Sequence, residues 1–165
     1  MSKSNRMLVA SIFIVLASVV IAIGLYCIPA VEKVNFTFHG YEMTPAGTAD
    51  AQSEIAFSAV KYHYLFKDDV YHSISLEING KKYNTSSYTN DITYWVHPSK
   101  AFDWIQFLDF TYNDIITFGI ALDHNSTWIG VTVITSDSDK QYFIGSSQQD
   151  FNPTELWQII GDFIA

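Results

Sequence analysis

The sequence predicts a mainly β protein: a single N-terminal transmembrane helix, then an antiparallel β-sandwich or barrel domain with a C-terminal α-helix. Three observations support this fold class. A long apolar run lies near the N-terminus, alternating polar and apolar residues dominate the middle, and the last dozen residues show apolar side chains at helical spacing. The single cysteine among 165 residues excludes a disulfide framework and a cysteine-based zinc site.

The apolar run extends from Met7 to Val31. It has 25 consecutive uncharged residues, of which 21 are apolar. A helix rises about 1.5 Å per residue and the hydrocarbon core of a bilayer is about 30 Å thick, so about 20 residues are enough to cross it. We therefore expect residues 7–31 to form a signal-anchor helix that contacts the lipid bilayer.

The charges that flank the run predict its orientation. Residues 1–6 contain Lys3 and Arg6 and no acidic residue, whereas the two charges that follow the run cancel. Positive flanks stay in the cytoplasm, so residues 1–6 are expected to be a cytoplasmic tail and residues 32–165 the extracytoplasmic domain of a single-pass cell-membrane protein. The alternative is secretion after signal cleavage, but signal peptides usually have only about 7–15 apolar residues.

The expected external domain is strongly acidic. Residues 32–165 contain seven lysines and seventeen acidic residues, a net charge of −10 with the histidines neutral. Nucleic-acid binding is not expected, because phosphate backbones are held by clustered cations. A negative surface favours a basic protein as partner, and it speeds the encounter with one.

Alternating side chains predict β-strands through most of this domain. The clearest local signal is Asn79-Gly80, which predicts a two-residue type I′ hairpin turn with Glu77 opposite Lys82. Short connections favour antiparallel neighbours. The strands are expected at residues 34–41, 53–66, 70–78, 91–97, 104–112, 115–122, 127–135 and 141–145.

A helix is predicted over residues 153–164. Asn152 can cap its N-terminus, Pro153 suits the first helical position, and Glu155 occupies the capping-box position. An apolar stripe is expected to pack on an open sheet face or to seal a barrel end. This stripe consists of Leu156, Ile159, Ile160 and Phe163.

The chain contains none of the common catalytic motifs. The elbow G-x-S-x-G, the zinc motif H-E-x-x-H, the Walker loop, G-x-G-x-x-G and C-x-x-C are all missing from the sequence. The only cysteine, Cys27, lies within the apolar run. We therefore predict no catalytic residue and no cofactor.

His63 and His72 are the candidate metal ligands. They flank the Lys67-Asp68-Asp69 turn, and a two-residue loop would place them opposite each other, where two imidazoles can share a metal. A three-residue loop would instead pair His72 with Tyr64, and it aligns the apolar residues of the two strands better. In that register both histidines are ordinary strand residues.

Aromatic residues are abundant after the apolar run, where 24 of the 26 lie. Such side chains either form a binding face for sugars, peptides or lipid headgroups, or fill a β core and pair across strands. The candidates for a binding face are Tyr62, Tyr64, Tyr94, Trp95, Trp104 and Trp128.

These observations favour a non-catalytic binding or inhibitory module displayed at the outer face of the membrane. One alternative is a calyx-type carrier of a small ligand, because about eight strands followed by a helix are typical of such barrels. Another alternative is an enzyme whose histidine and aspartate residues gather in a cleft.

Overall fold

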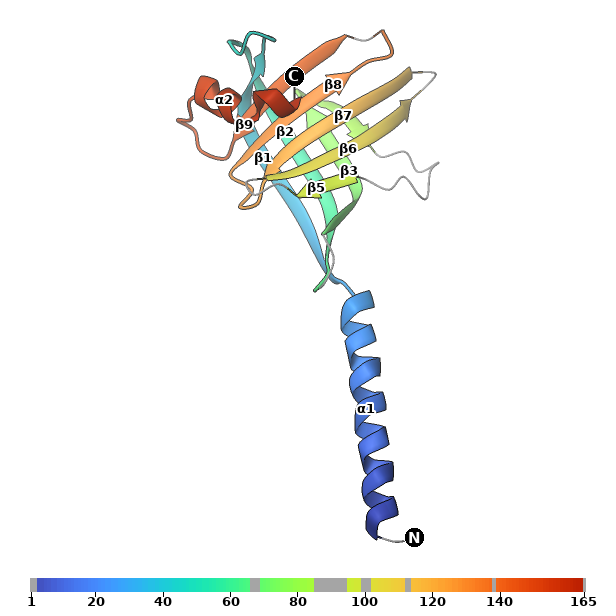
Figure 1. Cartoon of the computed structure of the whole chain (residues 1–165). Helices are drawn as coiled ribbons and strands as arrows, with labels where there is room; N and C mark the ends of the chain where they lie inside the picture. The colour runs from blue at the N-terminus through green and yellow to red at the C-terminus, as the bar shows by residue number, and fades with distance from the viewer. Residues whose placement is uncertain are drawn as a thin grey trace.

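The chain begins with helix α1 (Lys3–Cys27), which extends away from the rest of the molecule (Figure 1). The segment Val9–Cys27 is long and apolar enough to cross a membrane, and it is not buried against the rest of the protein. Helix α1 ends at Cys27, and Ala30 and Val31 already belong to the first strand. The computed structural model describes residues 3–65, 69–84, 95–98, 102–111, 114–137 and 139–164.

In the described residues, nine strands form a single antiparallel sheet. Each predicted strand has a counterpart, although the bounds differ by several residues in places. The strands are β1 (Ala30–Met43), β2 (Ala49–His63), β3 (Val70–Ile78), β4 (Lys81–Asn84), β5 (Trp95–Pro98), β6 (Phe102–Thr111), β7 (Asp114–Asp123), β8 (Trp128–Ile134) and β9 (Lys140–Ser146).

The strands follow the order β4-β3-β2-β1-β9-β8-β7-β6-β5 across the sheet. All eight pairings between neighbours are antiparallel, so the edge strands β4 and β5 run in the same direction. The sheet is curled, so that β6, β7 and β8 lie across from β1, β2 and β3 (Figure 1). The predicted mainly β, antiparallel architecture is confirmed.

Aromatic and aliphatic side chains fill the interior of the curled sheet. The alternation along β2 explains which residues point inward: Ile55, Phe57 and Ala59 are buried, while the residues between them are half-exposed. The opposite half of the sheet contributes Phe107 and Phe118, whose rings stack with their centroids 4.5 Å apart. Both halves therefore share one core.

Helix α2 (Pro153–Ile164) covers the outer face of β7, β8 and β9. Its start is capped as predicted, since the Thr154 amide donates a hydrogen bond to Asn152 Oδ1 at 3.1 Å. Leu156 and Ile160 are buried in a second, smaller core beneath the helix. Ile159 was expected in the same stripe but is 56% exposed, so the buried stripe is narrower than predicted.

The turn between β3 and β4 has the predicted form. Asn79 and Gly80 have φ angles of 51° and 81°, as a type I′ turn requires. Glu77 lies opposite Lys82, and their charged atoms are 3.6 Å apart. The register predicted from Asn79-Gly80 is confirmed.

The predicted register between β2 and β3 is wrong. Val60 lies opposite His72 and Tyr62 opposite Val70, which matches neither the two-residue nor the three-residue loop. The reason is that β2 ends at His63 and β3 begins at Val70, so six residues connect the strands.

A bulge in β3 shifts its alternation. The register changes between Ser58 and Val60 because β3 contains one extra residue there, and Ser73 within this stretch has a φ of 51°. Beyond the bulge, Tyr71 is buried in the core and His72 is exposed. The bulge therefore decides that Tyr71, not His72, faces the interior.

Strand β1 continues almost directly from α1, with only Ile28 and Pro29 between them. It pairs with β9 only over His39–Met43, whereas it pairs with β2 along its whole length. The first half of β1 and the last half of β2 therefore form a ribbon that reaches the end of α1 (Figure 1).

Candidate functional site

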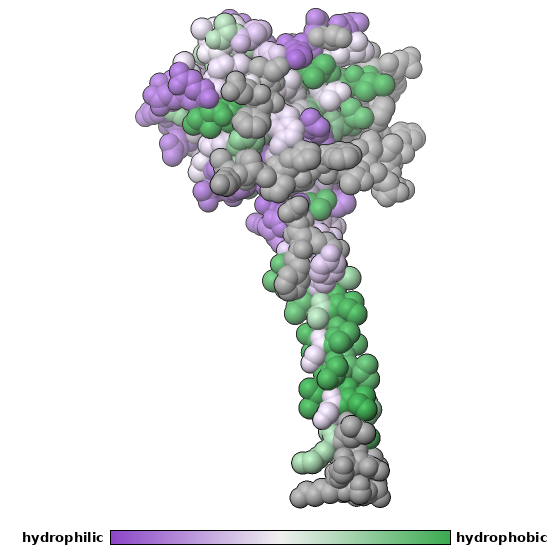
Figure 2. All heavy atoms as spheres, in the orientation of Figure 1, coloured by the Kyte–Doolittle hydropathy of each residue, from purple (hydrophilic) through white to green (hydrophobic). Residues whose placement is uncertain are grey.

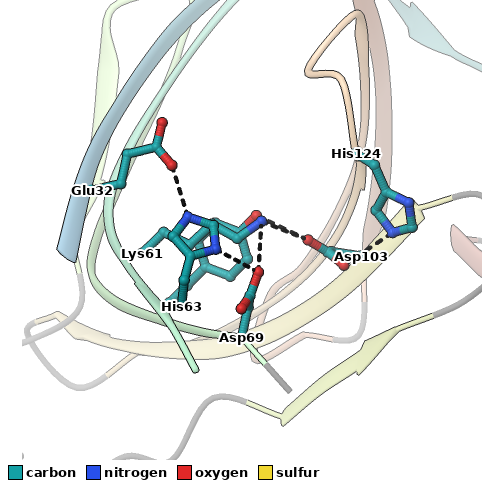
Figure 3. A network of polar contacts seen from close by, with 7 residues as sticks. Glu32, Lys61, His63, Asp69, Asp103 and His124 are labelled. Carbon is teal, nitrogen blue, oxygen red and sulfur yellow. Dashed lines mark hydrogen bonds and ion pairs between the residues drawn. The ribbon is translucent and has the colours of Figure 1, made fainter. Parts of the chain in front are cut away.

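Seven polar side chains meet inside the sheet at the end nearest α1 (Figure 3). They come from β1, β2, β3, β6, the segment before β3 and the turn between β7 and β8. We call this group the polar cluster; it consists of Glu32, Lys61, His63, Asp69, Tyr71, Asp103 and His124.

The alternation of the strands places these residues inside. Lys61 follows Ile55, Phe57 and Ala59 on the inner face of β2, so its ammonium group lies at the end of an otherwise apolar row. Asp103 precedes Ile105 on the inner face of β6 by the same alternation. Each charged residue therefore occupies a position where the pattern calls for an apolar one.

Asp103 is the centre of the polar cluster. Its Oδ2 accepts a hydrogen bond from the Tyr71 hydroxyl at 2.9 Å and lies 3.5 Å from Lys61 Nζ. Its Oδ1 lies 3.2 Å from His124 Nε2. The side chain is only 9% exposed, so these three contacts replace the solvation that this carboxylate would have in water.

His63 bridges two carboxylates. Its Nδ1 lies 2.8 Å from Asp69 Oδ2, and its Nε2 lies 2.8 Å from Glu32 Oε2. An ionised carboxylate only accepts hydrogen bonds, and a neutral imidazole has one N–H. Both contacts are hydrogen bonds only when the imidazole is protonated and donates from each nitrogen.

The buried ammonium and hydroxyl groups influence each other. Burial lowers the pKa of Lys61, but the hydrogen bond to Tyr71 and the charges of Asp103 and Asp69 outweigh this and hold the pKa above its usual value. Burial raises the pKa of Tyr71 from 10.0 to about 12, with Asp103 adding to the rise and Lys61 opposing it. At neutral pH Lys61 is therefore charged and Tyr71 keeps its proton.

The polar cluster joins the two halves of the curled sheet. Lys61 and Tyr71 belong to the half that contains β2 and β3, while Asp103 and His124 belong to the opposite half. Lys61 is 14% exposed and Tyr71 is 2% exposed, whereas His63, His124 and Glu32 are 38%, 43% and 58% exposed. The cluster therefore has a buried part and a part that is open to solvent. The arrangement is suited to holding the sheet closed at this end.

The structure does not bring His63 and His72 together. His63 lies on the inner side with Lys61 and Asp69, whereas His72 is exposed and packs edge-on against Tyr62 with a centroid distance of 4.8 Å. The bulge in β3 causes this separation. Within the described part of the chain, no group of three or more histidine, cysteine or acidic residues is arranged to hold a metal ion.

The predicted aromatic residues do not form one face. Trp104 and Trp128 pack against the small core beneath α2, while Tyr62 and Tyr64 are half-buried near the end of β2. Trp95 lies in β5, and Tyr94 lies outside the described residues. Packing in the core therefore accounts for Trp104 and Trp128.

Sequence analysis identified His63 but not its partners in the polar cluster. The available signal was the phase of alternation, since Lys61 and Asp103 both lie in register with buried apolar residues. A lysine and an aspartate on apolar faces of two strands suggest a buried ion pair. Comparisons with protein-family models, curated proteins and solved structures gave no match for this chain.

Proposed function

We propose that the protein is a membrane-anchored, non-catalytic binding module whose acidic β domain engages or blocks a basic partner at the outer face of the cell membrane. The observation that carries this proposal is the exposed apolar helix α1, which is joined to β1 by two residues. Figure 2 shows the helix as an apolar column below a domain with a mixed and hydrophilic surface. So short a connection keeps the domain next to the bilayer.

The distribution of charge supports a basic partner. Of the seven lysines in residues 32–165, Lys61 is enclosed in the polar cluster and contributes little to the surface. Exposed carboxylates occur at the end of the domain remote from α1, where Asp50 follows the β1–β2 turn and Asp137 and Asp139 lie between β8 and β9. A negative surface attracts a positive partner over about one Debye length, which is roughly 8 Å at physiological salt.

The two alternative functions, an enzyme and a carrier of a small ligand, have less support. An enzyme would need reactive groups that a substrate can reach, and in the polar cluster Asp103 and Tyr71 are buried and hydrogen-bonded to each other. The more exposed members His63, Glu32 and His124 are each paired with another residue of the cluster. A calyx-type carrier would need an apolar lumen, whereas Phe38, Phe57 and Phe118 occupy the interior. Two described hollows are open depressions on the outer side of the sheet.

Site-specific photo-crosslinking of the full chain in its own membrane tests the binding role. A crosslinkable residue at exposed Ser136 is expected to capture a protein partner at low salt and several-fold less at high salt. Replacing Asp50, Asp137 and Asp139 by Asn should weaken capture in the same way. As the matched control, replacing Lys81 and Lys82 by Gln should leave capture unchanged or strengthen it.

Capture that is equal at both salt concentrations, or that resists loss of the three carboxylates, would contradict an electrostatic partner site. No adduct at all from Ser136 in the native membrane would count against binding at this end of the domain.

A further inference from the structure

The end of the sheet nearest α1 carries apolar and aromatic side chains on its outer face. Val31 lies opposite Tyr62, and Tyr62 lies opposite Val70, so the three form one row across β1, β2 and β3. Val31 is 59% exposed, and Tyr62 and Val70 are half-buried. Leu65, which lies beyond the end of β2, is 66% exposed. We call Val31, Tyr62, Leu65 and Val70 the basal patch.

We propose that the basal patch inserts into the interface of the bilayer that α1 crosses, so that the domain is held on the lipid surface by two contacts. This inference rests on the proposed membrane anchoring. It adds a lipid-binding surface on the β domain itself, and the surface fixes how the domain is turned relative to the membrane.

The register brings the basal patch to the membrane end of the domain. Ala30, the first residue of β1, is paired with His63, the last residue of β2. Leu65 follows two residues later, which is a span of up to about 7 Å at the strand rise of about 3.3 Å per residue. Because β2 runs toward α1, this span leads back toward the level of Ile28.

The length of α1 determines how deep the basal patch lies relative to the bilayer. The 19 residues Val9–Cys27 extend over about 28 Å, which nearly fills the hydrocarbon core of about 30 Å. The headgroup region adds about 5–7 Å on each side. Because only Ile28 and Pro29 separate Cys27 from β1, Val31 and Leu65 are expected within or at the edge of this headgroup region.

The residue types suit that depth. Tyrosine is enriched at membrane interfaces because its ring is apolar and its hydroxyl remains hydrated. Ile28, at the junction with α1, is 73% exposed, so the apolar surface of the helix continues to the base of the domain. The exposed Lys33 follows on the outer face of β1, two residues farther from the helix, where its ammonium can contact lipid phosphates.

Lipid is the occupant that the position favours. The end of β2 is paired with the start of β1, which follows α1 after two residues, so lipid surrounds this end of the domain whenever the helix is inserted. Burying an exposed leucine side chain away from water is favourable. A protein partner would have to displace lipid from the same space.

Depth-dependent fluorescence quenching in protein-free phosphatidylcholine liposomes tests the proposal on the full chain. In a Cys27→Ser background, single cysteines at Leu65, Leu16 and Ile115 are labelled with an environment-sensitive dye. Ile115 is the matched control, because it is also an exposed apolar residue, 52% exposed, but lies at the remote end of the sheet.

The dye at position 65 is expected to be quenched several-fold more by a nitroxide near the lipid headgroup than by aqueous iodide. The dye at position 115 should respond to iodide alone, and the dye at position 16 to a nitroxide deep in the acyl chains. If the dye at position 65 is quenched by iodide alone, as at position 115, while the dye at position 16 is quenched by the lipid nitroxide, the lipid contact of the basal patch is refuted. The membrane anchoring by α1 is then still supported. If position 16 is not quenched by lipid, the anchoring fails as well. Protection of position 65 only in cell membranes would indicate a protein occupant and overturn the lipid assignment.

Discussion

At the scale of single residues, Asp103 decides the stability of the polar cluster. Its carboxylate has three partners in a nearly solvent-free site, and one of them is the buried ammonium of Lys61. Removing the charge of Asp103 would leave Lys61 without its most enclosed counter-ion. Glu32 also makes a short contact in the cluster, but its side chain is 58% exposed.

We expect Asp103→Asn to lower the free energy of unfolding by about 3 kcal/mol, because it removes the more enclosed of the two carboxylates that pair with Lys61. Lys61 then keeps only Asp69, which lies 3.3 Å away and is 31% exposed. The matched variant Glu32→Gln should cost less than about 1 kcal/mol, since exposed ion pairs contribute little. Denaturant unfolding of the full chain in detergent micelles, followed by circular dichroism, measures both. Equal losses for the two variants would show that Asp103 has no special role.

The raised pKa of Tyr71 predicts an alkaline transition. A group whose pKa is higher in the folded state stabilises the fold fully below its unfolded pKa of about 10, and this stabilisation is lost as the pH rises through the folded value of about 12. The melting temperature of the wild type should therefore fall across this range, and Tyr71→Phe should reduce the fall. Parallel profiles for the wild type and Tyr71→Phe would contradict the assigned role of Tyr71.

The candidate site could be predicted from the sequence only in part. The alternation places Lys61 and Asp103 on apolar faces, which marks them as buried charges. Their meeting depends on the curl of the sheet, which brings together residues 42 positions apart. Tyr71 belongs to the polar cluster only because of the bulge at Ser73, and no residue pattern in β3 predicts that bulge.

At the scale of helices and strands, short sequence motifs predicted the structure correctly where the motif alone determines the backbone geometry. The Asn79-Gly80 turn fixes the register of β3 and β4, and the capping residues fix the start of α2. The β2–β3 connection has no comparable signal, and its register follows from packing across the whole sheet. This is why the one hairpin was predicted correctly and the other was not.

The packing of α2 gives a test at this scale. Ile160 is fully buried against the outer face of the sheet, whereas Ile159 beside it is 56% exposed. Ile160→Ala should lower the free energy of unfolding by about 2–4 kcal/mol, because it removes buried methyl groups and leaves a cavity. Ile159→Ala should change it by less than about 0.5 kcal/mol. The same denaturant titration measures both variants. A large loss of stability for Ile159→Ala with none for Ile160→Ala would show that the buried face of α2 is assigned wrongly.

At the scale of the whole molecule, one curled sheet is joined to one apolar helix. The sequence did not distinguish a sandwich from a barrel, because the deciding contact pairs the first strand with the last, and His39 lies opposite Ser146. That pairing brings β9 next to β1, and the polar cluster then closes the end of the sheet that faces α1. The remote end carries the exposed carboxylates of Asp50, Asp137 and Asp139.

We propose that α1 holds this domain outside the cell membrane, and the accessibility of single cysteines in intact cells tests this topology. In the Cys27→Ser background, single cysteines replace Ser4 and the exposed Ser147. A membrane-impermeant maleimide should label position 147 in intact cells and position 4 only after permeabilisation, with both proteins resisting alkaline carbonate extraction. Labelling of position 4 with protection of position 147 would reverse the proposed topology, and recovery of the full chain in the soluble fraction would rule out membrane anchoring.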